Sequence, residues 1–316
     1  MVGGVIAALF AAFAWSLNFI VPFVIGDYSV FDFALFRFLI SGLLGLSFLA
    51  CNIQAVRKLR LADWLVAFLL GLIGYLGYFL AVVGSAIYAG PVIAPAILGL
   101  TPVVLAIGGN WRQRAVSWKD LTLPLTLSAV GLLLVNSGSV NRSSAVSMQS
   151  VVVGICLAIT AVGLWTWFGI LNQSALAKRP QIDAGVWTAL IMSGAGLGML
   201  VFVPVGSLLG VFEIPRLGLR WQTAAALYIW GTALACGASV GGALAWTFAA
   251  QRVPVVLSAQ LITTETIFGT IFGLLVRHRW PTVAEIVGMS LLMAGVMLVI
   301  WSVYGQRALA LEHQSA

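Results

Sequence analysis

Residues 150–173 read SVVVGICLAITAVGLWTWFGILNQ and contain no acidic or basic side chain. A helix needs about 20 mostly apolar residues to cross the roughly 30 Å hydrocarbon core of a bilayer. Within that core the backbone must satisfy its hydrogen bonds inside the segment, so a spanning stretch of this kind folds as a helix. The sequence therefore predicts a transmembrane helix at these residues.

The predicted fold of the whole chain is an all-α polytopic membrane protein. Of the 316 residues, 61% are hydrophobic and 8% are charged, whereas soluble domains carry roughly 25% charged residues. This composition excludes a soluble fold and a disordered chain, and the long apolar runs argue against an outer-membrane β-barrel. The ten predicted spans cover residues 3–25, 33–52, 64–85, 91–109, 121–137, 150–173, 184–209, 222–249, 254–276 and 283–304.

The net charge of +7 fits a membrane topology signal better than nucleic-acid binding, because the basic residues lie in the short gaps between spans. With the N-terminus inside, ten of the 16 basic residues fall in inner loops and five in outer loops. Basic residues favour the cytoplasmic side. The sequence therefore predicts a multi-pass protein of the cell (inner) membrane with both termini in the cytoplasm and no nucleic-acid partner.

The two halves of the chain resemble each other. Three pairs of segments match in the same order, at offsets of 150, 163 and 164 residues: 11–16 with 161–166, 95–101 with 258–264, and 129–135 with 293–299. The matches predict two five-helix repeats. The predicted boundaries are a first repeat at 1–137, a linker at 138–149, a second repeat at 150–305 and a cytoplasmic tail at 306–316.

The two repeats are predicted to have opposite orientations in the membrane. Because each repeat has five spans, an odd number, the second repeat must enter the membrane from the side opposite to the first. Two similar bundles related by a pseudo-twofold axis in the membrane plane are typical of secondary transporters, which bind their substrate near the midplane. The sequence thus predicts inverted repeats around a central site.

Several motifs resemble the drug/metabolite transporter superfamily, and more narrowly its EamA-type ten-helix members. They are Ala34–Phe38, Tyr78–Leu80, Ala89–Ala94, Leu100–Val103, Trp246–Pro254, Thr264–Phe268 and Gly288–Gly295. The resemblance implies export of small metabolites, such as amino acids, by alternating access. It also implies that the fifth and tenth spans are peripheral and that the other eight form the central cavity.

Two ionisable residues lie within predicted spans. Glu265 sits in the ninth span, where a carboxylate costs about 2.5–3.5 kcal/mol unless it faces a cavity or a partner. It either binds a substrate ammonium group or a coupling proton, or it is a structural glutamate between helices. Arg37 lies a few residues inside the second span. It either binds a substrate carboxylate, snorkels to the interface, or pairs with Asp32.

Aromatic residues are candidates for the cavity wall. Tryptophan normally prefers the membrane interface, yet several lie deep in the first and sixth spans. The alternative is ordinary bundle core. The candidates are Trp15, Asn18, Trp165 and Trp167, with Tyr75, Tyr78 and Trp246 as weaker ones. Walls of this kind favour aromatic or hydrophobic solutes.

Polar residues on the ninth span share one helix face. Gln260, Thr263 and Thr264 follow the i, i+3, i+4 spacing. They either line the cavity or join neighbouring helices by hydrogen bonds. Thr101, which aligns with Thr264 in the repeat, is a further candidate.

Signatures of other chemistry are absent from the sequence. There is no Walker A pattern and no GxSxG elbow, and two histidines and three unpaired cysteines offer no metal site. We therefore expect no enzyme, no cofactor and no metal. The predicted function is secondary transport of small organic metabolites, amino acids first, by a monomer that contacts only its small-molecule substrate and the lipid bilayer. Carriers of cationic drugs or nucleotide sugars, a membrane transferase and a channel remain alternatives.

Overall fold

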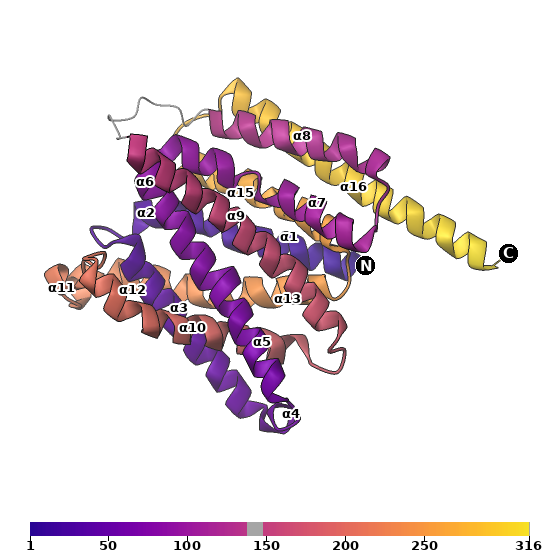
Figure 1. The fold of residues 1–316 in the computed structure, drawn as a ribbon. Helices are drawn as coiled ribbons and strands as arrows, with labels where there is room; N and C mark the ends of the chain where they lie inside the picture. The colour runs from indigo at the N-terminus through magenta and orange to yellow at the C-terminus, as the bar shows by residue number, and fades with distance from the viewer. Residues whose placement is uncertain (138–147, 316) are drawn as a thin grey trace.

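A computed structural model describes residues 1–137 and 148–315, and within these residues every regular element is helical (Figure 1). The first-half elements are α1 (Val2–Ser16), η1 (Leu17–Ile20), α2 (Val21–Val24), α3 (Val30–Cys51), α4 (Ile53–Val56), α5 (Leu61–Gly71), η2 (Leu72–Gly77), α6 (Tyr78–Leu98), α7 (Thr101–Gln113) and α8 (Trp118–Ser137). The second-half elements are α9 (Met148–Ala177), α10 (Ala184–Leu208), α11 (Ile214–Leu217), α12 (Trp221–Leu234), η3 (Ala235–Gly242), α13 (Ala243–Ala250), α14 (Val255–Ile262), α15 (Thr264–Val276) and α16 (Val283–Ser315). The predicted all-α polytopic fold is confirmed.

Nine helices in the described part of the chain are long and apolar enough to cross a membrane. The predicted fourth span, 91–109, is not among them, because α6 continues to Leu98 and α7 has only 13 residues. The predicted loop between the third and fourth spans is therefore helical instead.

Contacts with α9 nevertheless indicate the expected tenth pass, because they place the return of the chain between Ala89 and Leu105. Along α9, Gly74 lies against Phe168, Ala89 lies against Gly154, and Leu105 lies against Gly169. The chain thus runs down the length of α9 by Ala89 and has returned to its starting level by Leu105. The sixteen residues from Ala89 to Leu105 can span about 24 Å as a helix, which is close to the length of α9 between Gly154 and Gly169.

Reciprocal contacts between the halves show the predicted inverted symmetry. A Cβ at Gly42 in α3 would lie 3.0 Å from the Cα atom of Gly196 in α10, and a Cβ at Gly196 would lie 2.9 Å from the Cα atom of Gly42. Glycine permits this close crossing of two helices. The pair α8 and α16 crosses in the same reciprocal way. Gly131 meets the carbonyl of Gly288 and Gly295 meets the carbonyl of Pro124, two contacts that a shift of 164 residues interchanges.

The irregular segments repeat as well. The segments η2 and η3 are both π-helical, and they begin 163 residues apart. The same offset relates the breaks after α6, at Gly99 and Leu100, and after α14, at Thr263. Short π segments in a helix frequently mark functional sites, and these two lie in equivalent passes of the two halves.

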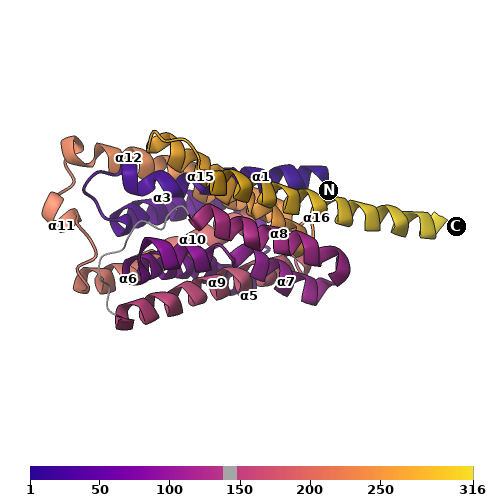
Figure 2. The same ribbon diagram turned by 90° about the horizontal axis from the view of Figure 1, so that it is seen from above.

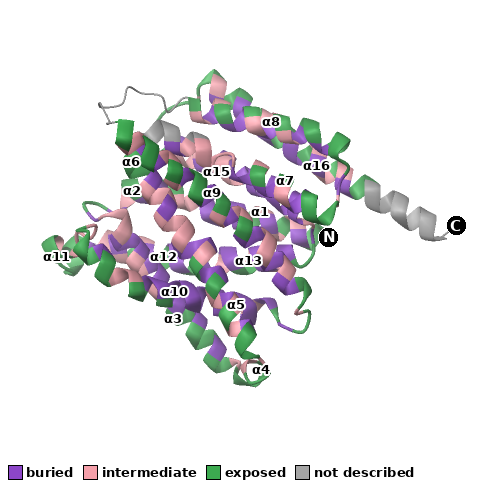
Figure 3. Cartoon of the chain, viewed as in Figure 1, coloured by how far each residue is buried: buried purple, intermediate pink, exposed green. Residues whose placement is uncertain are grey.

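The outer surface of the bundle is apolar, as a lipid-facing surface must be. Exposed side chains recur along one stripe of α9, including Val152, Ile159 and Trp167 (Figure 3). The helices α8 and α16 pack against each other along one edge of the molecule (Figures 1 and 2), as the family resemblance implied for the fifth and tenth spans. Most of the predicted linker, 138–149, lies outside the described residues, and the predicted tail continues α16 as a helix to Ser315.

Candidate functional site

Three buried tryptophans from three helices meet at the centre of the bundle. The ring centroids of Trp15 and Trp165 are 5.2 Å apart, and Trp246 lies 5.7 Å from the first and 6.1 Å from the second. Tyr78 adds its ring 5.0 Å from that of Trp165. Trp15 and Trp165 are equivalent residues at the offset of 150, so the two repeats meet at this pair. The prediction that Trp15, Trp165, Trp246 and Tyr78 lie together is consistent with this cluster.

Trp15 is fixed by the π-helical segment η3. Its indole Nε1 donates a hydrogen bond of 2.8 Å to the carbonyl oxygen of Ala238. A Cβ at Gly242 would lie 2.6 Å from the same nitrogen, so glycine is needed for the ring to reach the backbone. Because a π segment breaks the regular i→i+4 bonding, its carbonyls can accept such a side-chain donor.

Arg37 is held inside the bundle by two neutral partners. It is buried, its Nε donates to Ser239 Oγ at 2.6 Å, and its Nη1 donates to Asn18 Oδ1 at 2.5 Å. Asn18 in turn donates to the backbone carbonyl of Trp15 at 2.7 Å. These bonds join α3, η1 and η3, and no carboxylate among residues 1–137 and 148–315 forms an ion pair with the guanidinium.

Two of the interpretations open for Arg37 are therefore wrong. The side chain does not snorkel to the interface, because it bends into the bundle toward Ser239. Nor does it pair with Asp32. The Asp32 carboxylate caps the start of its own helix, accepting from the backbone N–H of Ser29, and it also accepts from the N–H of Glu213.

Glu265 faces the same interior region from the first turn of α15, just after the helix break at Thr263. It interacts electrostatically with Arg37 and with Tyr78. The carboxylate is half-buried, and within the described residues it forms no ion pair with Arg37. The interior thus holds one negative and one positive group that are close enough to interact and are not joined to each other.

The polar face predicted on the ninth span is a contact between helices. Gln260 is fully buried, and its Oε1 accepts a hydrogen bond of 2.8 Å from Ser128 Oγ of α8. Thr263 and Thr264 donate to carbonyls three residues earlier in their own chain. Thr101 does the same at the equivalent break, donating to Leu98. Gln260 thus joins α14 to α8 through its oxygen, its Nε2 is buried without a hydrogen-bond partner among the described residues, and the two aligned threonines stabilise the helix breaks.

Trp167 does not join the aromatic cluster. It is 59% exposed and lies on the lipid-facing stripe of α9 with Ile159. Two residues along a helix correspond to a turn of about 200°, so Trp165 and Trp167 point to opposite sides. The prediction that Trp167 lines the cavity is wrong, because depth in the membrane does not determine the direction of a side chain.

The structure adds two residues that the sequence did not indicate, Ser239 of η3, which binds Arg37, and Thr166, whose hydroxyl is buried without a hydrogen-bond partner among the described residues. The Nε1 of Trp246, already a candidate, is buried without a partner in the same part of the chain. A buried N–H left without a partner costs free energy. Trp246 lies in the aromatic cluster, so its free donor is available to a bound solute. The only signal in the sequence was the glycine-rich run that surrounds Ser239.

One end of the bundle is closed by a glutamine clasp, which we define as Gln113, Gln173 and Val255. Gln113 Nε2 donates to Gln173 Oε1 at 2.7 Å, and Gln113 Oε1 accepts from the backbone N–H of Val255 at 3.0 Å. Gln173 also donates to the carbonyls of Ala250 and Val253. Beside the clasp, Arg179 and Asp63 form an ion pair of 2.6 Å. These contacts join the two halves of the chain at the predicted cytoplasmic end.

Two inverted five-pass bundles around oppositely charged interior groups are typical of secondary membrane transporters. Residues 2–137 match the EamA-like transporter family. The chain is 28% identical over 314 residues to the inner membrane protein YtfF of Escherichia coli (strain K12), covering 95% of both chains. It also resembles a crystal structure with a TM-score of 0.70 at 15% identity, over 95% of this chain and 97% of the other, which shows a shared fold.

The first half of the chain thus matches the EamA-like transporter family, and nearly the whole chain is similar to YtfF, in line with the resemblance of the sequence motifs.

Proposed function

We propose that this transporter exports or exchanges amino acids by alternating access, with aromatic and hydrophobic amino acids preferred. The observation that carries the proposal is the pair Arg37 and Glu265, two opposite charges that face one interior region without an ion pair between them in the described residues. An amino acid carries an ammonium and a carboxylate on one carbon. Glu265 binds the ammonium group, and Arg37 binds the carboxylate.

The aromatic cluster supports a preference for flat apolar side chains. Trp15, Trp165 and Trp246 present indole faces with centroids 5.2 to 6.1 Å apart, a range in which aromatic rings interact favourably. Trp246 offers an indole N–H without a partner among the described side chains. A solute ring that enters between them gains ring contacts and a hydrogen-bond donor.

Two other carrier functions differ in the charges they require. A cationic drug needs Glu265 and the tryptophans alone, and cation–π contacts favour it. A nucleotide sugar brings a diphosphate, for which the interior offers one arginine already bound to Asn18 and Ser239. The interior charges therefore favour a zwitterion first and a cation second. A channel or a transferase gains no support from the closed clasp or from two opposite interior charges.

The proposed location is the inner membrane, with both termini in the cytoplasm. The name of the Escherichia coli relative supports the location, and the excess of basic residues on the same side as the clasp supports the orientation. The substrate and the lipid bilayer are the proposed partners, and the transporter acts as a monomer without a cofactor or a metal.

A counterflow screen tests the substrate class. Vesicles containing the protein and loaded with unlabelled phenylalanine are expected to accumulate labelled phenylalanine, because exchange is faster than net flux in a carrier. Phenylethylamine, which lacks the carboxylate, and phenylpropionate, which lacks the ammonium group, are expected to exchange at least about tenfold more slowly, since each leaves one buried charge unpaired. Equal exchange of the amine would favour the cationic-drug function instead, and non-saturable flux would favour a channel.

A matched pair of tryptophan variants tests the position of the cavity. Trp165→Ala is expected to lower the rate of counterflow by roughly tenfold, because it removes the ring at the centre of the cluster. Trp167→Ala, two residues away on the lipid-facing side, is expected to leave the rate within about twofold. Both rates are compared at equal amounts of protein in the vesicles. The interpretation fails if the two variants are impaired equally.

A further inference from the structure

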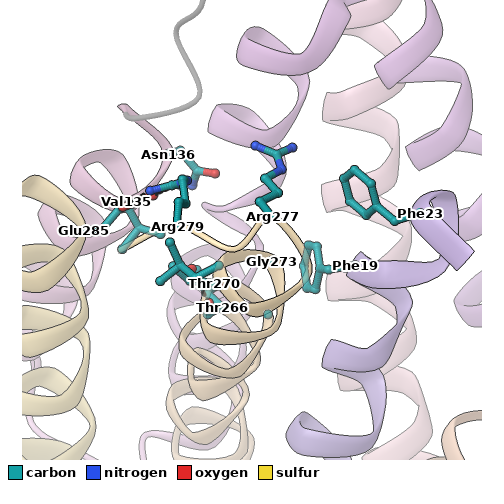
Figure 4. Close-up of a pocket in the computed structure, with 12 residues that line it drawn as sticks. Phe19, Phe23, Val135, Asn136, Thr266, Thr270, Gly273, Arg277, Arg279 and Glu285 are labelled. Carbon is teal, nitrogen blue, oxygen red and sulfur yellow. Dashed lines mark hydrogen bonds and ion pairs between the residues drawn. The ribbon is translucent and has the colours of Figure 1, made fainter. Parts of the chain in front are cut away.

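At the end of the bundle opposite the glutamine clasp lies an open pocket of about 180 Å³ (Figure 4). It is bounded by the ends of four passes. Phe19 and Phe23 come from η1 and α2, Asn136 comes from the end of α8, Glu285 comes from the start of α16, and α15 supplies Thr266, Thr270 and Gly273. The pass α14–α15 begins at the clasp, with Val255, and ends at this pocket, with Arg277.

The floor of the pocket is next to the proposed substrate site on two helices. Phe19 directly follows Asn18, which binds Arg37, and Thr266 directly follows Glu265. The pocket is therefore adjacent to the proposed substrate site along α15.

The pocket carries one positive charge without a counter-charge. Arg279 is neutralised by Glu285 through hydrogen bonds of 2.5 and 2.8 Å, which raise the pKa of Arg279 above its usual value. Arg277 forms no ion pair within the part of the chain that the structure describes, and its guanidinium lies 5.3 Å from the ring centre of Phe23. The sequence between Ser137 and Met148 contains no acidic residue.

The two symmetric ends of the bundle differ in packing. The repeat offsets of 150 and 163 pair Phe23 with Gln173 and Val276 with Gln113. At the clasp end the equivalent residues are joined by a hydrogen bond of 2.7 Å. At the pocket end, Phe23 and the end of α15 leave a cavity between them. One end is closed and its symmetric counterpart is open, which is the asymmetry that alternating access requires.

We propose that the pocket is the outer mouth of the transport path and that Arg277 binds the carboxylate of the solute there. This inference rests on the proposed function and extends it to a second binding position. In the mouth, the carboxylate pairs with Arg277 while the apolar side chain of the solute packs on Phe19 and Phe23. The equivalent position at the clasp end is Arg114.

Thiol labelling tests the charge and the access of the pocket without measuring transport. In a chain whose three cysteines are replaced by alanine, Gly273→Cys places a thiol in the pocket one helical turn from Arg277. Among the described atoms, none lies within 4 Å of a Cβ at Gly273, so the change is tolerated. Membrane-impermeant thiosulfonates, one with an anionic sulfonate and one with a cationic ammonium group, are added from outside.

The anionic reagent is expected to react faster, and Arg277→Gln is expected to lower the anionic-to-cationic rate ratio by roughly tenfold. Arg220→Gln, which removes another exposed arginine at the same end of the bundle, serves as the control and is expected to leave the ratio within about twofold. A ratio unaffected by Arg277→Gln, or a thiol unreactive from outside, overturns the proposal.

Protection experiments identify the ligand. Benzoate is expected to slow labelling, and benzamide, which has the same ring without the charge, is expected to have no effect. Equal protection by both compounds overturns the carboxylate site. Protection by phosphatidylglycerol alone, in vesicles without benzoate, assigns the pocket to a lipid headgroup and also overturns it. Failure of amino-acid counterflow would contradict the proposed function and leave these labelling results unchanged.

Discussion

Replacing Glu265 with glutamine is expected to lower amino-acid counterflow by about 10- to 100-fold, because a charged hydrogen bond to the solute contributes about 1.5–3 kcal/mol. Glutamine has nearly the same shape as glutamate. The carboxylate is half-buried and takes part in no ion pair within the described residues, so the fold does not depend on its charge. The loss is therefore expected in the rate of transport, with the amount and the thermal stability of the protein unchanged.

The control for this prediction is Glu213→Gln. Glu213 is an exposed carboxylate just before α11, paired with Arg216 at 2.7 Å, and surface pairs of this kind contribute little. Counterflow in this variant is expected to equal that of the unchanged protein. If Glu265 is only a structural group between helices, Glu265→Gln will transport at the normal rate with the normal response to pH, and the residue must then be removed from the proposed mechanism.

The membrane spans could be predicted from the sequence because they depend on composition and length. Apolar runs of about 20 residues must become helices in a bilayer, whichever direction the individual side chains take. The direction of each side chain was harder to predict. The helix α9 is apolar on nearly every side, so no contrast of hydrophobicity separates Trp165, in the cluster, from Trp167, toward lipid.

The parts of the site that the sequence missed depend on tertiary contacts. Ser239 binds Arg37 only because η3 is π-helical and lies beside α3. No residue pattern distinguishes such a segment from an ordinary helix rich in glycine. Gln260 illustrates the same limit, because its partner Ser128 comes from another pass 132 residues away. The spacing of residues along one helix shows which side chains share a face of that helix. It does not show which neighbouring helix packs against that face.

Cross-linking the glutamine clasp is expected to abolish transport. Alternating access requires the two halves to separate at this end, and Gln113 uses both atoms of its amide to join the first half to Gln173 and Val255 of the second. Two hydrogen bonds of about 1 kcal/mol each are weak enough to break during a transport cycle. A covalent bridge that joins positions 113 and 173 would not break during the cycle.

The double variant Gln113→Cys with Gln173→Cys is made in the chain whose three native cysteines are replaced by alanine. Its counterflow is expected to continue until a short bis-thiosulfonate forms a disulfide with each cysteine, and to return when a thiol reductant cleaves these disulfides. Each single variant treated with the same reagent is the control and is expected to remain active, because one modified thiol cannot join the halves. The extent of bridging is measured by mass spectrometry of the same samples. Undiminished counterflow in fully bridged protein would show that the clasp stays closed throughout the cycle, and the solute would then have to leave the bundle at a point other than between Gln113 and Gln173.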